Sequence, residues 1–289
     1  MLPDRRVLRA DLRDSDHWVA CDWQAGPIGD NLALVQWVLP GTSFPDAVRL
    51  LTGAVAESVP EARAVASRAV AYPRLPPGAD PARGRAYLRD RGISDATVEM
   101  AELAGLLRHA RDGVLFLGRD HGATARSVRS VTVRYFEPQL APDGSSLTKR
   151  DFANSDKGFP GFLPGDPATV IVVEGGVNAL AAADLAVNAS LPSPTVIVTG
   201  GVGVRSWVRG NAHLRAMLAA AETVEILGER EGDPAKQEKT DLLRARLQQE
   251  IAAETRGGEL PAIIYPPEGV ADAAEWNLAV QGAAGHACP

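Results

Sequence analysis

The chain has 289 residues, 45% of them hydrophobic and 23% charged, which is typical of a globular protein with one large domain or two ordinary ones. No apolar run approaches the length that spans a membrane, and the first residues lack the apolar segment of a signal peptide, so we expect a cytoplasmic protein with no membrane partner. The net charge is −6, and the two cysteines, Cys21 and Cys288, are too few for a disulfide framework or a zinc site built on several thiolates.

The N-terminal region, residues 1–58, is expected to begin with a strand and continue with two short helices. The stretch HWVACDW alternates apolar and polar residues, as a half-buried strand does. The apolar spacing predicts a helix in DNLALVQWVL and another in SFPDAVRLLTG. A proline-rich passage, AYPRLPPGADP, follows and is typical of a linker.

The second region, residues 81–165, combines helices with strands. Helices are predicted in ARGRAYLRDRG and in DATVEMAEL, the second with Ser94 or Asp95 as its N-cap. Two strands are predicted in GVLFLGRDHG and TARSVRSVTVRYFEP. We expect a small α+β module here.

The third region, from residue 168 to about residue 270, alternates strands with helices. The strand-like segments are TVIVVE, TVIVTG, TVEILGE and AIIYP, and each is separated from the next by a helix-like segment. Buried apolar strands joined by crossover helices form a parallel sheet that is covered on both faces. The sequence therefore predicts an α/β fold, with a Rossmann-like parallel sheet of four or more strands preceded by smaller α+β modules.

Acids and glycines stand where these strands end. The first strand ends at Glu174, the second at Gly200 and Gly201, and the third at Glu229 and Glu231. Ligands of parallel sheets bind at the carboxyl ends of the strands, and several carboxylates at one edge can hold a hard divalent cation such as Mg²⁺. Two alternatives stay open: Glu174 stabilises the start of the next helix, and the other two acids are solvated.

The motif VEGGVNAL, Val173 to Leu180, and the later strand end VEILGEREGD resemble the Toprim domain, the metal-binding module of bacterial-type primases, topoisomerases and some nucleases. The resemblance implies that Glu174 is catalytic and that Glu229 and Glu231 hold Mg²⁺ or Mn²⁺. The chain departs from the family pattern at Asn178, where an Asp is usual, and in having Glu-x-Glu in place of Asp-x-Asp.

Other charged residues near these motifs have possible roles in the site and, for most of them, an ordinary structural alternative. Asp233 is either a third metal ligand or the N-cap of the next helix. Arg230 lies between the two acids in sequence and would neutralise both if its side chain points inward. The acids Asp272 and Glu275 are either a distal pair at the sheet edge or solvated. The residues expected to shape the site are Gly175, Asn178, Gly200 and Gly201.

More of the chain resembles the Toprim proteins of plasmids and mobile elements, which carry a degenerate primase-like N-terminal module. The similar segments are HWVACDW, GDNLALVQWV, YLRDRGIS, KRDFANSDKGFPGF and EWNLAV. The resemblance divides the chain into a zinc-ribbon-type module without zinc (1–58), an intermediate domain (81–165) and a Toprim domain (166–289). His17 and Cys21 are one plausible ligand pair and do not make a zinc site.

Six basic residues are candidates for contact with nucleic acid, the alternative for each being an ordinary solvated charge. They are Arg126, Arg129, Arg134, Lys149, Arg150 and Lys157.

Two classes of function remain. The first is Mg²⁺-dependent phosphoryl or nucleotidyl transfer on nucleic acid, with DNA favoured, in a primase-like enzyme of plasmid or mobile-element replication or mobilisation, or in a nuclease. The second is a catalytically degenerate Toprim protein that binds DNA or a replication or mobilisation partner.

Overall fold

The structure, a computed structural model, describes residues 72–120, 127–141 and 143–285, together with the backbone of residues 8–13, 17–22 and 26–29. The chain divides into two compact units, Met1–Val70 and Ala71–Pro289.

In the described part of the first unit, three strands form an antiparallel sheet in the order β1-β2-β3. The strands are β1 (Leu8–Arg13), β2 (His17–Asp22) and β3 (Gly26–Gly29). The strand predicted in HWVACDW is confirmed as β2. The helices predicted at 30–39 and 43–53, and the side chains of His17 and Cys21, lie outside the described residues.

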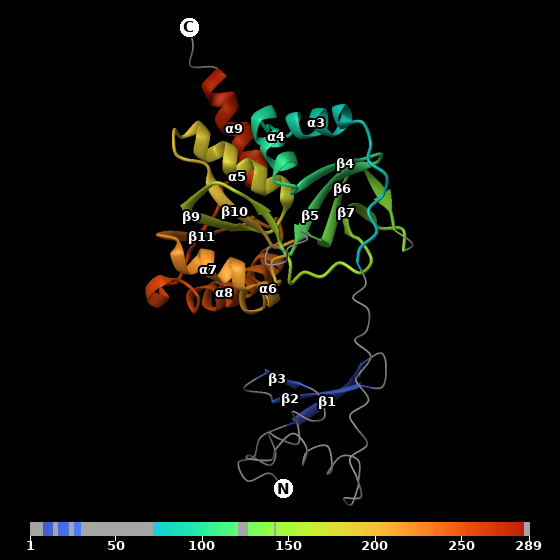
Figure 1. Ribbon diagram of the computed structural model, residues 1–289, viewed down its shortest axis with the longest axis vertical. Coiled ribbons are helices and arrows are strands. Elements are labelled where there is room, and N and C mark those ends of the chain that lie inside the picture. Colours follow the sequence, from blue (N-terminus) through green and yellow to red (C-terminus); the bar gives the residue numbers. More distant parts are fainter. Residues whose placement is uncertain are drawn as a thin grey trace, which may run out of the picture. The chain divides into compact units, whose positions relative to one another are not determined.

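The second unit is built around one mixed sheet, whose nine strands in the described residues run in the order β12-β11-β9-β10-β8-β5-β6-β7, with β4 paired to β5 (Figure 1). These strands are β4 (Leu107–Ala110), β5 (Gly113–Arg119), β6 (Val128–Leu140), β7 (Ser146–Asp151), β8 (Gly161–Leu163), β9 (Asp166–Val173), β10 (Pro194–Val198), β11 (Thr223–Leu227) and β12 (Ala262–Ile264). The first four in spatial order are parallel, as the strand–helix alternation predicts. The remaining strands pair antiparallel.

Helices cover both faces of the parallel half, which confirms the α/β prediction (Figure 1). The helices described in this unit are α3 (Pro81–Arg89), α4 (Asp95–Leu103), α5 (Gly176–Asn188), α6 (Ser206–Gly210), α7 (Ala212–Ala220), α8 (Pro234–Ala252) and α9 (Ala273–Gly285), with a 3₁₀ turn at Arg256–Gly258. One core joins α4, α5 and α9 to the sheet, and a second joins α6, α7 and α8 to its opposite face. Trp207, fully buried, lies in the second core.

Local capping explains where several helices begin. The Ser94 hydroxyl accepts a hydrogen bond from the Thr97 amide, so Ser94 is the N-cap of α4. The helix-like segment between the second and third predicted strands forms two helices, α6 and α7, because Asn211 leaves the helical conformation and its side chain caps α7 at the Leu214 amide. Asparagine competes with the helix for backbone hydrogen bonds in this way.

One short contact joins the antiparallel and parallel halves of the sheet. Strand β8 pairs with β10 on one side and meets β5 on the other at Gly118 and Gly161. Residues 81–165 and 166–289, which the sequence separates into two domains, therefore share a single sheet.

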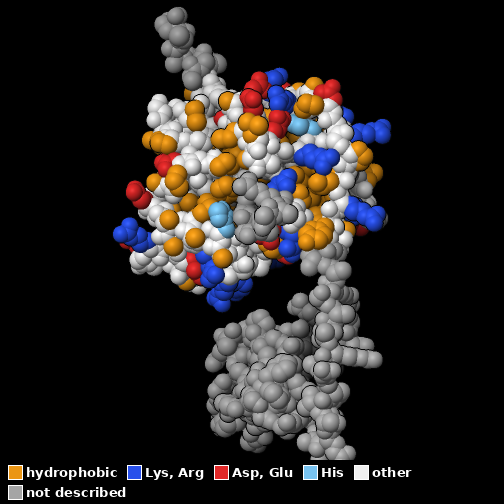
Figure 2. Space-filling view, in the orientation of Figure 1, with side chains coloured by type: hydrophobic (Ala, Val, Ile, Leu, Met, Phe, Trp, Pro, Cys, Tyr) orange, Lys and Arg blue, Asp and Glu red, His pale blue; other side chains and the backbone are white. Residues whose placement is uncertain are grey.

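The surface of this unit carries mixed charges. Figure 2 shows Lys and Arg side chains at separate points on the face in view, among apolar and acidic side chains. None of the helices in the described ranges has the length and apolar character needed to cross a membrane.

Candidate functional site

The register of the sheet brings three strand ends to one level. Val173 at the end of β9 lies opposite Val198 of β10 and Leu227 of β11. Glu174 follows directly after β9 and Glu229 comes two residues after β11. The two acids therefore lie at the same edge of the sheet, as predicted from the strand ends.

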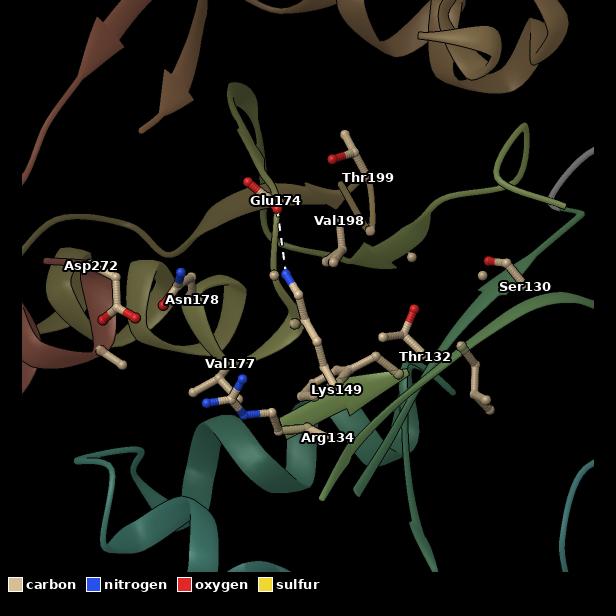
Figure 3. Close-up of a pocket in the computed structure, with 18 of the residues that line it drawn as sticks. Ser130, Thr132, Arg134, Lys149, Glu174, Val177, Asn178, Val198, Thr199 and Asp272 are labelled. Carbon is tan, nitrogen blue, oxygen red and sulfur yellow. Dashed lines mark hydrogen bonds and ion pairs between the residues drawn. The ribbon is translucent and has the colours of Figure 1, made fainter. Parts of the chain in front are cut away.

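A cavity of about 130 Å³ opens beside these strand ends (Figure 3). Its parallel-sheet side contributes the acids Glu174, Glu229 and Asp272. Its antiparallel side contributes cations from β6, from β7 and from the loop after β7, namely Arg134, Lys149 and Lys157. The cavity thus brings together acids and bases from separate parts of the chain, and we call it the site cavity.

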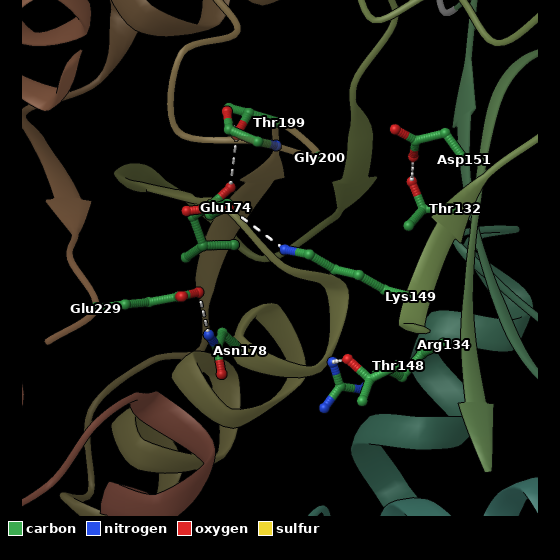
Figure 4. A network of polar contacts seen from close by, with 12 residues as sticks. Thr132, Arg134, Thr148, Lys149, Asp151, Glu174, Asn178, Thr199, Gly200 and Glu229 are labelled. Carbon is green, nitrogen blue, oxygen red and sulfur yellow. Dashed lines mark hydrogen bonds and ion pairs between the residues drawn. The ribbon is translucent and has the colours of Figure 1, made fainter. Parts of the chain in front are cut away.

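Glu174 is neutralised from the antiparallel half of the sheet. Lys149 extends from β7, and its Nζ lies 3.4 Å from Glu174 Oε1 (Figure 4). The Glu174 side chain is 18% exposed and the Lys149 side chain 53% exposed, so the pair is open to solvent on the lysine side. The main-chain oxygen of Glu174 accepts a hydrogen bond from the Gly200 amide, which fixes the backbone from which the carboxylate extends.

Glu229 is bound by an amide. Asn178, on the first turn of α5, donates a hydrogen bond of 2.7 Å from Nδ2 to Glu229 Oε1 (Figure 4). Burial raises the pKa of Glu229 above its ordinary value, and the negative charges of Glu174 and Asp272 raise it further, against the lowering effects of Lys149 and Asn178. The site cavity therefore holds a carboxylate whose ionised form is disfavoured.

Replacing Glu229 with Gln is expected to stabilise the chain at neutral pH. A raised pKa means that the folded state keeps this proton to higher pH than the unfolded state does, so stability falls as pH rises from the ordinary value of 4.5 through the raised value. The free energy of unfolding of Glu229→Gln, measured in urea, should exceed that of wild type near pH 7. The excess should disappear below pH 4.5, and parallel pH profiles for the two proteins would contradict this account of Glu229.

The other acidic candidates lie outside the residues that line the site cavity. The Glu231 carboxylate pairs with Lys236, and the Glu231 amide donates to Gln237 Oε1 at 2.6 Å. Asp233 is the N-cap of α8 and accepts a hydrogen bond of 2.9 Å from the Ala235 amide.

Arg230 does not point inward, so the condition under which it would neutralise both neighbouring acids is not met. Its Nε donates to the Pro266 main-chain oxygen at 2.7 Å, and its guanidinium lies 5.5 Å from the centre of the Tyr265 ring. A carbonyl and an aromatic face thus hold the arginine away from the strand end, and Asn178 and Lys236 are the partners of the two carboxylates.

The arrangement can be tested against the divalent ion that the resemblance implies. Glu174, Glu229 and Glu231 each bind a partner from the chain itself. Among residues 72–120, 127–141 and 143–285, no three His, Cys, Asp or Glu side chains are grouped in a way that could hold a metal ion. The described residues, as arranged, therefore do not fit a Mg²⁺ or Mn²⁺ ion held by these carboxylates.

The arginines of the second predicted strand face opposite ways. Successive side chains of a strand alternate between its two faces, so Arg134, with Ser130 and Thr132, faces the site cavity. Arg129 faces the other side, pairs with Asp156 at 3.0 Å and lies over the Phe159 ring at 4.0 Å. Arg126 lies outside the described residues. The expected three-arginine track is therefore reduced to Arg134 on the cavity side.

The same alternation divides the other basic candidates. On β7 Lys149 lines the site cavity, whereas Arg150, the next residue, is exposed and is not among the lining residues. Lys157 Nζ contacts Asp151, Thr132 Oγ1 at 3.1 Å and the Gly200 main-chain oxygen at 3.4 Å.

One of the expected glycines, Gly200, has a clear steric role, and so does Gly176, which is not among the expected residues. Gly200 adopts a φ of +74°, and a Cβ there would meet the Lys157 side chain. Gly175 is the N-cap of α5, with no side chain to cap the helix, and a Cβ at the next residue, Gly176, would overlap the Phe116 ring. The strand-to-helix turn thus packs too closely for larger residues.

The polar residues Arg91, Ser130 and Thr132 line the site cavity although the sequence prediction gave them no role. The period-2 pattern of β6 could have identified the latter two, since both share a face with Arg134. Asp272, expected to be either distal or solvated, lines the cavity and caps α9 through the Glu275 amide at 3.0 Å.

Comparisons with known proteins give little further information. No protein-family model and no curated protein matches the chain. A solved structure of the RNA polymerase domain of Mycobacterium tuberculosis primase DnaG, in complex with a double-stranded DNA oligomer with a 6-nucleotide overhang, is similar over 70% of this chain and 72% of that chain. The identity is 16% and the TM-score 0.37, a level of similarity that carries no inference about function.

Proposed function

We propose that this chain is a primase-like protein of the Toprim type that binds nucleic acid, with DNA as the favoured kind, and that the cation side of the site cavity contacts the phosphate backbone. The activity we favour is binding without metal-dependent chemistry. This is the function of a degenerate accessory protein in plasmid or mobile-element replication or mobilisation.

The observation that carries this proposal is the state of Arg134. Its guanidinium bonds to two neutral groups, Tyr87 Oη and Thr148 Oγ1, both at 3.2 Å. No acidic side chain pairs with it among the residues that the structure describes. Arginine binds phosphate oxygens readily because its planar fork of donors matches their geometry.

A second feature concentrates positive charge at the same place. Arg134 of β6 lies directly opposite Lys149 of β7 in the sheet register. Like charges opposite each other across a strand pair repel, so a phosphate that approaches both would relieve an existing cost. Arg134, the member of this pair that has no acidic partner among the described residues, therefore favours an anionic ligand there.

Metal-dependent phosphoryl or nucleotidyl transfer, which the resemblance implies, remains a second candidate. The observation in its favour is that Glu174, Glu229 and Asp272 line one cavity. The partners already bound to the first two carboxylates weigh against it. A nuclease and a primase-like enzyme would need the same carboxylates, so one ion-binding experiment, given below, bears on both.

The proposed binding can be measured by fluorescence anisotropy of the full chain with labelled single-stranded DNA, duplex DNA and RNA of one sequence. Because the contact is to phosphates, we expect the affinity for DNA to fall about tenfold or more between about 50 mM and about 200 mM salt. Binding that does not change with salt would contradict a phosphate contact. An absence of binding to all three ligands at low salt would favour a protein partner instead.

A further inference from the structure

The acids of the site cavity need a positive charge. Glu174 and Glu229 lie at neighbouring strand ends of one parallel sheet and share a cavity with Asp272. Like charges in a partly buried space repel one another strongly, because the medium screens them less than water does. A sheet edge of this kind is stable only when a cation or a set of donors is present.

We propose that Lys149 is a built-in counter-ion, which takes the place that a divalent cation would otherwise take between these carboxylates. The ammonium reaches Glu174 Oε1 at 3.4 Å and comes from β7, on the far side of the cavity from the acids (Figure 4). This inference goes beyond the proposed DNA contact, because it concerns how the chain keeps an acid pair without metal.

The neighbours of the acid pair are suited to an edge without metal. Asn178 offers a donor to Glu229, whereas an aspartate there would add a further carboxylate with no proton to donate. Lys236 pairs with the carboxylate of Glu231, which does not line the site cavity. Glu174, Glu229 and Glu231 thus each have a partner from the chain. That partner is an amide for Glu229 and a lysine for the other two.

Strand register fixes the face of β7 from which Lys149 extends. It lies directly opposite Arg134, so its charge is repelled from the β6 side and drawn across the cavity toward Glu174. The ammonium thus meets one carboxylate of the pair directly, and Asn178 supplies the donor to the other.

The test is thermal unfolding of the full chain with and without millimolar Mn²⁺, in wild type and in Lys149→Met. Methionine keeps the length of the side chain and removes its charge. Arg150→Met is the matched control, because it removes one positive charge from the next residue of the same strand, on the face away from the cavity. Binding of the ion to the folded state alone raises Tm by mass action.

We expect Mn²⁺ to leave the Tm of wild type and Arg150→Met unchanged and to raise that of Lys149→Met by about 3 °C or more once the ion is tenfold above its Kd. The double variant Lys149→Met/Glu174→Gln should lose this response, which identifies the ion's position. A wild type stabilised by Mn²⁺ would overturn the proposal, and so would a Lys149→Met protein indifferent to it, or a response that survives in the double variant.

The outcome is separable from the proposed function. Anisotropy on the same wild-type sample reports DNA binding, so a wild type that binds DNA and is also stabilised by Mn²⁺ would refute the counter-ion and leave the binding function intact. A wild type whose Tm does not change with Mn²⁺ and that binds no nucleic acid would refute the binding function and leave the counter-ion proposal intact.

Discussion

Asp184→Ala is expected to lower the free energy of unfolding by about 3 kcal/mol, because each buried donor left without an acceptor costs about 1–3 kcal/mol. Asp184 is 4% exposed and lies on α5. Its carboxylate accepts hydrogen bonds from the Ser94 amide at 2.7 Å, from Ser94 Oγ at 2.7 Å and from Thr97 Oγ1 at 2.6 Å. One carboxylate thus ties α5 to the first turn of α4.

The charge adds to this loss. An acid beside a helix N-terminus interacts favourably with the helix dipole, and Asp184 faces the N-terminus of α4. Asp184→Asn keeps one acceptor oxygen and should fall between alanine and wild type. Urea denaturation followed by circular dichroism gives the free energy of unfolding of wild type and both variants. Glu99→Ala, which removes an exposed acid of α4, is the control and should lower this free energy by less than about 0.5 kcal/mol. Equal losses in Asp184→Ala and the control would contradict the linkage of the two helices.

Gly118→Ala is expected to lower Tm by about 6–12 °C, from an overpacking cost of about 3 kcal/mol in a unit of this size. A Cβ at Gly118 would overlap the main-chain oxygen of Phe159 and the hydroxyl of Ser130. Those two atoms are themselves hydrogen-bonded at 2.7 Å. The main chain cannot move aside as a flexible side chain would, so the strain is not relieved locally.

The position matters for the site as well as for stability. Gly118 pairs with Gly161 at the contact between β5 and β8, which joins the strands carrying Arg134 and Lys149 to those carrying Glu174. Gly210→Ala is the control, since a Cβ at Gly210 meets no atom within 4 Å. Differential scanning fluorimetry compares the two variants, and a Gly118→Ala protein as stable as the control would show that the halves of the sheet are held together elsewhere.

The parallel half of the fold is predictable from sequence because its signal is local. Four uninterrupted apolar runs alternate with helix-length segments, and the carboxyl ends of parallel strands must meet at one edge. That reasoning places Glu174 and Glu229 together without any knowledge of the antiparallel strands. The N-cap of α4 is narrowed to Ser94 or Asp95 in the same way, because an N-cap is recognised from a few neighbouring residues.

The charge partners of the site are not predictable in this way. Lys149 and Glu174 are 25 residues apart, and their contact depends on the register of β7 against β6 and on the position of β8 between the two halves. Arg230 illustrates the converse, because adjacency to two acids in sequence says nothing about where a long side chain points. A carbonyl and an aromatic ring, brought near by the strand after α8, decide its direction.

Arg134 is the residue on which the proposed phosphate contact depends most directly. We expect Arg134→Ala to weaken binding of the full chain to DNA about tenfold at low salt, since charged hydrogen bonds contribute about 1.5–3 kcal/mol, and to flatten the dependence of log affinity on log salt by about 0.7–0.9. Arg215→Ala, which removes an exposed arginine of α7, should leave both values unchanged. Anisotropy titrations of the three proteins measure this, and an Arg134→Ala protein with the affinity and salt slope of wild type would contradict the proposed nucleic-acid contact.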